Sequence, residues 1–97
     1  MRDYDLTPFR SHPLFESYYA RLPEEFPRTE LEKYLPKVIS HRTLANRAVD
    51  RNKALRDGRL DDAERLAPPT IRVGRQDHFE RDRFLWWLFT YWVKTPA

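Results

Sequence analysis

Hydrophobic positions in the first third of the chain recur at helical spacing, but only in short stretches separated by prolines. Leu14, Tyr18 and Leu22 stand at i, i+4 and i+8, the spacing of one helix face. Thr29 and Glu32 have the spacing of a capping box, which predicts one further helical turn. Each proline disfavours helix in the residue before it, and this part contains Pro8, Pro13, Pro23, Pro27 and Pro36. We therefore expect residues 1–36 to be an extended, proline-rich segment with short helices that lies over another surface.

A longer helix is predicted between Lys37 and Gly58, because the apolar residues there share one narrow face. Ser40 is placed to cap its N-terminus, and Gly58 is placed to end it in the left-handed conformation. The apolar face carries Leu44, Ala45, Ala48 and Leu55. Asp61 then opens a second, shorter helix, because acidic residues are favoured in a first turn, and Pro68 ends it.

The corner between these two helices has Gly58 in the turn and Ala63 behind it. Over about a dozen residues it resembles the turn of a tetratricopeptide-type repeat. No second copy follows, and such repeats need neighbours to bury their faces. We therefore interpret residues 37–69 as a single basic helix–turn–helix corner.

Residues 70–97 are predicted to be a short link followed by a C-terminal helix. Residues 70–74 alternate apolar and polar side chains, which suits a brief extended link or an edge strand. A cap-like pair, Asp77 and Glu80, opens the helix, which we expect to run to about Lys94 before Pro96 ends it.

The C-terminal helix is apolar all round between Phe84 and Val93. A helix of that kind is buried on every side or lies in lipid. The rest of the chain offers little apolar cover for it, so three interpretations compete: the helix is the core of the domain, it anchors in a groove of a partner, or it inserts partly into a membrane interface. The residues predicted to bind a partner or a membrane are Phe84, Leu85, Trp86, Trp87, Leu88, Phe89, Tyr91 and Trp92.

Composition supports a chain that depends on a partner. Of the 97 residues, 34% are charged and 40% are hydrophobic, a small fraction from which to build a core, and eight prolines interrupt the helices. We therefore predict an all-α fold of a few short helices, one longer middle helix and an aromatic C-terminal helix. We expect this single structural unit not to be a compact independent globule.

The net charge of +3 comes mainly from arginine, which pairs with carboxylates and phosphates. The residues predicted to bind an acidic partner, lipid headgroups or phosphate are Arg42, Arg47, Arg51, Arg56, Arg81, Arg83 and Lys94. Absence of cysteine excludes disulfides and thiol catalysis, and it favours an intracellular rather than a secreted protein. Neither glycine belongs to a phosphate-cradling motif and no nucleophile motif is present, so we expect no enzyme activity, cofactor or metal.

These patterns favour a non-enzymatic accessory subunit of a larger assembly. We expect it in a membrane-embedded organellar complex of the respiratory or ATP-synthase type, bound to other subunits and to phospholipid at the mitochondrial inner membrane, peripherally or partly embedded. One alternative is a small RNA-contacting protein of an organellar ribosome, with the arginines of the middle helix on RNA phosphates. Another is a soluble adaptor or a phage or bacterial structural protein.

Overall fold

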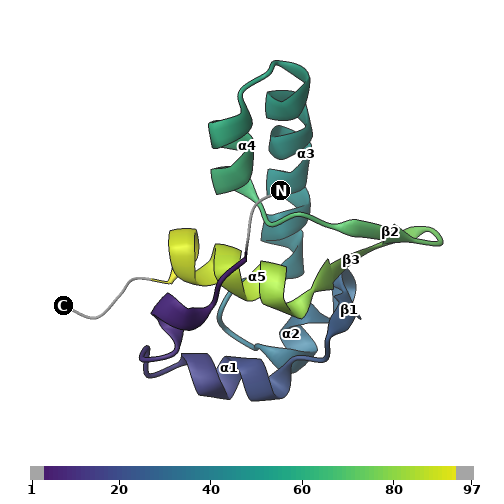
Figure 1. Cartoon of the computed structure of the whole chain (residues 1–97). Helices are drawn as coiled ribbons and strands as arrows, with labels where there is room; N and C mark the ends of the chain where they lie inside the picture. The colour runs from purple at the N-terminus through teal and green to yellow at the C-terminus, as the bar shows by residue number, and fades with distance from the viewer. Residues whose placement is uncertain (1–3, 94–97) are drawn as a thin grey trace.

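A computed structural model describes residues 4–93 of the chain (Figure 1). In its N-terminal part a 3-10 turn, η1 (Thr7–Phe9), precedes α1 (Phe15–Arg21), β1 (Glu25–Pro27), a second 3-10 turn, η2 (Arg28–Glu30), and α2 (Leu31–Tyr34). The helical hairpin follows as α3 (His41–Arg56) and α4 (Leu60–Leu66). Strands β2 (Ile71–Val73) and β3 (Gln76–Glu80) then lead into α5 (Arg81–Trp87) and a π-helical turn, η3 (Leu88–Trp92).

The predicted all-α class is wrong, because the chain also forms a three-stranded antiparallel sheet with the order β1–β3–β2. Phe26 of β1 lies opposite Phe79 of β3, and both rings are buried. Pro27 is tolerated in β1 because that strand lies at an edge of the sheet. Strand β3 takes residues that we assigned to the first turn of the C-terminal helix, so Asp77 is in a strand and α5 begins only at Arg81.

The prediction that the chain is not compact is also wrong. Its Cα radius of gyration is 13.2 Å, close to the value of about 13 Å expected for a folded domain of 100 residues. In Figure 1, α5 crosses the middle of the molecule with α1 on one side and the α3–α4 hairpin on the other. The C-terminal aromatic helix is therefore the centre of the fold.

The aromatic residues of α5 and η3 are covered by the part of the chain that we expected to lie over another surface. The Phe89 ring contacts the rings of Phe9, Phe15 and Tyr18 with centroids 5.9, 5.6 and 5.9 Å away. Phe84 lies 5.1 Å from Phe79 of the sheet, measured between ring centroids. The proline-rich segment does lie over a surface, but the surface belongs to its own chain.

The helical hairpin agrees closely with its sequence signals. The Ser40 hydroxyl accepts a hydrogen bond from the Thr43 amide at 3.0 Å, so Ser40 caps α3 as predicted. Gly58 has φ +77 in the turn before α4, the left-handed conformation expected there. The predicted capping box fails, because neither η2 nor α2 has a side-chain cap and the Glu32 carboxylate instead binds the amide of His41 at 2.8 Å.

Candidate nucleic-acid interface

The predicted aromatic contact residues lie mostly inside the molecule. Phe84, Leu85, Trp87, Leu88 and Phe89 are 0, 0, 1, 0 and 4% exposed. Trp86 is half-buried against Tyr4, and Tyr91 and Trp92 are each 36% exposed. The interpretation of this helix as the core of the domain is thus supported by its burial, and the idea that it lacks cover within the chain is wrong. No helix within residues 4–93 has both the length and the apolar content needed to cross a membrane.

The predicted basic contact residues do not form one surface. Arg47 lies on the inner face of α3, where it donates to the Leu66 carbonyl at 3.1 Å and sits 5.1 Å from the centroid of the Trp92 ring. Arg51, on the same face, is half-buried beside a pocket of about 100 Å³ that Trp86 and Trp87 also line.

Two further basic residues on the predicted list are engaged on α5, away from the hairpin. Arg81 donates to the Tyr19 hydroxyl at 2.7 Å and lies over that ring. Arg83 pairs with Glu80 at 3.3 Å and stacks over Tyr4. The prediction for Lys94 falls outside the described residues.

The outer face of α3 has a different character. At about 100° per residue, five exposed residues fall within a sector of about 80°, opposite the face that packs on α4. We call them the outer stripe: Arg42, Asn46, Val49, Lys53 and Arg56. No side chain of the stripe forms a hydrogen bond or ion pair with another residue in the described part of the chain. Asp50, the one acidic residue of α3, lies beside the stripe rather than in it.

The N-terminus of α3 is held firmly by the segment before it. Leu35 and Ile39 are buried, and Lys37 between them takes φ +65, which reverses the chain from α2 into α3. The Glu32 carboxylate of α2 accepts from both the backbone amide and the Nδ1 of His41, at 2.8 and 3.0 Å. These bonds, with the backbone amide as the larger effect, lower the pKa of Glu32 below its usual range. Helices α2 and α3 are thereby fixed to each other as two helices joined by a turn.

A β-hairpin provides a second basic projection. Strands β2 and β3 are joined by Gly74, at φ +63, and Arg75, which is exposed and has no ion-pair partner among residues 4–93. Next to the pair that closes this turn, Asp77 binds Arg28 at 3.0 Å and Arg72 at 3.1 Å. Figure 1 shows the hairpin projecting to the side of the molecule on which α3, rather than α4, lies.

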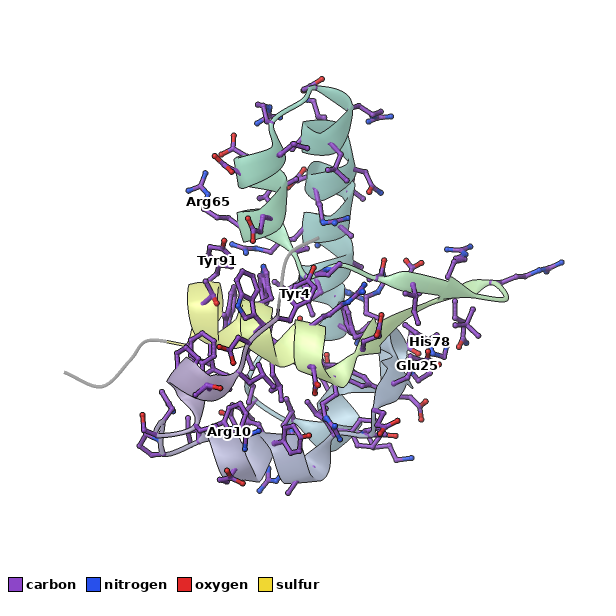
Figure 2. All side chains as sticks on the ribbon, viewed as in Figure 1. Tyr4, Arg10, Glu25, Arg65, His78 and Tyr91 are labelled. Carbon is purple, nitrogen blue, oxygen red and sulfur yellow. The ribbon has the colours of Figure 1, made fainter. Side chains whose placement is uncertain are left out.

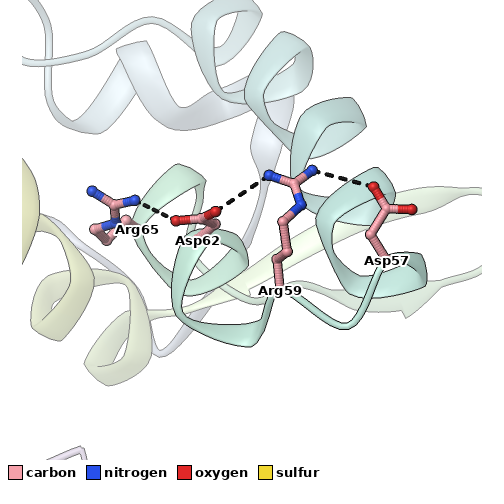
Figure 3. Close-up of polar contacts among 4 residues, drawn as sticks. All are labelled: Asp57, Arg59, Asp62 and Arg65. Atoms are coloured by element: carbon pink, nitrogen blue, oxygen red, sulfur yellow. Dashed lines mark hydrogen bonds and ion pairs between the residues drawn. The ribbon is translucent and has the colours of Figure 1, made fainter.

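Charges at the tip of the helical hairpin are neutralised within the chain, in contrast to those of the outer stripe. Arg59 bridges Asp57 at 3.3 Å and Asp62 at 3.2 Å, and Asp62 also binds Arg65 (Figure 3). The hydrogen bond from Arg65, followed by that from Arg59, lowers the pKa of Asp62. These exposed ion pairs leave no excess positive charge at the tip.

Comparison with known protein families, with curated proteins and with solved structures found no match for this chain. The site therefore rests on the geometry of its residues. Sequence reasoning selected Arg42 and Arg56 of the outer stripe but did not single out Asn46, Val49, Lys53 or Arg75. For the outer stripe, the missed signal was the spacing of its five residues at i, i+4, i+7, i+11 and i+14 along α3, which places them on one face.

Proposed function

We propose that the protein binds double-stranded DNA, with the outer face of α3 in the major groove. The observation that carries this proposal is the outer stripe. It has three exposed cations, Arg42, Lys53 and Arg56, without an internal partner in the described chain, on a helix whose opposite face packs against α4. Unpaired arginine and lysine on one helix face are suited to phosphate binding. Helix–turn–helix DNA-binding modules have two helices joined by a turn and place the second helix in the major groove. The similar arrangement of α2 and α3 adds weaker support, because it is an analogy of fold alone.

The dimensions of α3 suit this role. An α-helix with its side chains is about 10–12 Å wide, and the major groove of B-form DNA is about 12 Å wide. Arg42 and Lys53 are eleven residues apart, or about 16 Å along the helix axis at about 1.5 Å per residue. Extended side chains at that separation reach the phosphates on the two walls of the groove. Arg75, on the projecting β-hairpin, supplies a further cation outside the groove.

RNA, the partner of our earlier alternative, fits this surface less well. The major groove of an RNA duplex is too deep and narrow to admit side chains from a helix. Recognition of single-stranded RNA relies on exposed aromatic side chains that stack on bases. The outer stripe contains no aromatic residue, so its chemistry favours a DNA duplex.

A role as an accessory subunit of a larger membrane-embedded assembly is our second candidate. Fewer exposed residues support it than the sequence suggested. Tyr91 and Trp92 retain 36% exposure and could contact a partner. Most of the aromatic surface of α5 and η3, which the sequence suggested would need a partner to cover it, is buried within the chain itself. Cooperative thermal unfolding of the purified chain as a monomer would argue against a subunit that needs its assembly to fold.

The DNA proposal is tested by titrating a fluorescent 20-base-pair duplex of random sequence with the purified chain at several salt concentrations. The double variant R42Q/R56Q removes two charges from the outer stripe. We expect it to bind at least tenfold more weakly and to reduce the slope of log K against log salt by about 1.8, because each lost phosphate contact reduces the slope by about 0.9.

The matched control is R10Q/R21Q, which removes the same charge from the region of α1, where both residues are exposed. Figure 2 labels Arg10 there. We expect this control to bind DNA almost as well as the wild type. Equal losses in the two double variants would show that net charge alone drives binding and would remove α3 from the interface. Preference for an RNA hairpin over the DNA duplex would refute the choice of nucleic acid.

A further inference from the structure

We infer that the protein prefers DNA containing two adjacent A·T pairs, read by Asn46 and Val49 at the centre of the outer stripe. This inference rests on the proposed function. It starts from an oddity of the stripe: a surface built only to bind phosphates needs cations, yet its central positions carry an amide and an aliphatic side chain. Val49 is 66% exposed, and the Asn46 side chain has no partner within residues 4–93.

Each of these two side chains has a chemical counterpart on an A·T pair. An asparagine amide forms two hydrogen bonds with adenine, donating to N7 and accepting from the N6 amino group. The C5-methyl group of thymine is the apolar group that the major groove presents, and a valine side chain is suited to contact it. An isolated exposed valine is ordinary on a protein surface. A valine one helical turn from an unpaired amide, on a face lined by cations, is better matched to base edges.

The positions also fit the spacing of base pairs. Asn46 and Val49 are three residues apart, which corresponds to about 4.5 Å along the helix and about 60° around it. Stacked base pairs lie about 3.4 Å apart, so the two side chains reach neighbouring pairs. Arg42 precedes Asn46 by four residues and Lys53 follows Val49 by four, so the cations flank the reading pair at about 6 Å on each side along the axis.

The first experiment is selection from a pool of random duplexes, carried out with the wild-type chain, N46A and V49A. We expect the wild type to enrich two adjacent A·T pairs. N46A should lose the preference at one pair and V49A at its neighbour. Both variants should retain the salt-dependent binding to random DNA that the cations provide, since neither substitution changes the charge.

The second experiment replaces thymine by deoxyuridine in the selected duplex, which removes only the C5-methyl group. We expect the wild type to bind the uracil duplex about threefold to fourfold more weakly, the effect of one lost buried methyl. V49A should bind both duplexes equally. N46A should bind the thymine duplex about tenfold more weakly than the wild type and should still distinguish thymine from uracil.

The outcomes separate this inference from the proposed function. If R42Q/R56Q weakens binding but selection enriches no A·T pair, the inference is wrong while DNA binding by α3 stands. An undiminished thymine preference in V49A would also overturn the role of Val49. If the wild type binds no duplex at all, the proposed function and the inference fall together.

Discussion

The inner and outer faces of α3 carry similar basic side chains in different environments. On the inner face, Arg47 bonds to the end of α4 and stacks on Trp92, so its charge serves the packing of the chain. On the outer face, Arg42 and Arg56 are exposed and make no bond to the rest of the described molecule. Charge counted along a sequence therefore identifies candidate contacts only once the packing face of the helix is known.

The strongest test of this contrast removes the packing behind the inner face. Trp87 is 1% exposed, and its indole N–H donates to the Glu64 carbonyl of α4 at 3.0 Å. We expect W87A to reduce the free energy of unfolding by about 3–5 kcal/mol, as measured by chemical denaturation. W87F, which keeps the ring volume in part but loses the hydrogen bond, should cost less than half as much. An unchanged stability in W87A would mean that packing of Trp87 does not hold the α3–α4 hairpin on α5.

A direct comparison of the two faces uses Arg47 and Arg42. R47A should lose about 1–2 kcal/mol of stability, because a half-buried hydrogen bond and a cation–π contact both disappear. R42A should change stability by less than about 0.5 kcal/mol, as expected for an exposed residue without partners, and should weaken DNA binding instead. The measurements are denaturation and duplex titration for both variants. If R42A destabilised the chain as much as R47A, the distinction between the faces would fail.

The smallest effect is expected at the N-terminus of α3, where Glu32 accepts from the His41 amide. The pKa of this carboxyl is lowered in the folded chain, first by that backbone bond. Its stabilising contribution is therefore complete above the unfolded pKa of about 4.3 and is lost as pH falls through the lower, folded pKa. We expect E32Q to have a lower melting temperature than the wild type at pH 7, and the difference to shrink as the pH falls below the unfolded pKa toward the lower, folded one.

The control for this pH series is E16Q, which neutralises an exposed acid in the first turn of α1. The difference between E16Q and the wild type should be smaller at pH 7 than that of E32Q. A melting-temperature difference for E32Q that persisted unchanged at pH 3 would show that the carboxylate charge is not what holds the start of α3.

The elements that could be predicted from the sequence are those whose signals are local. Ser40, Gly58 and the acidic residues after it define the ends of α3 and α4 because a cap acts on its own helix. The sheet could not be found in this way. Strand β1 has three residues in a stretch full of prolines, and its partner β3 lies far along the chain, so neither strand has a strong signal without the other. Gly74 followed by Arg75 was the available hairpin signal.

The burial of the aromatic helix was missed for a related reason. From the sequence, the only cover we expected came from Leu44, Ala48, Leu55 and Leu66 and from the cluster at residues 14–19. Much of the cover comes from rings, Phe26 and Phe79 in the sheet and Phe9 and Phe15 near the N-terminus. Each aromatic ring covers a large area, so a few of them replace many aliphatic residues. Which rings meet is decided by topology rather than by spacing along the chain.

Burial of the aromatic helix by the N-terminal segment affects how the chain reaches its native state. The ring of Phe89 is enclosed by residues from the first fifth of the sequence, so the core joins segments 71–80 residues apart. Contacts over such separations form late, since most of the loop-closure entropy is spent before they are gained. During synthesis, the apolar residues of the N-terminal segment stay exposed to solvent until the aromatic helix has emerged from the ribosome. Folding of this core therefore follows synthesis of the aromatic helix, and the N-terminal segment is the part of the nascent chain that stays unpacked longest.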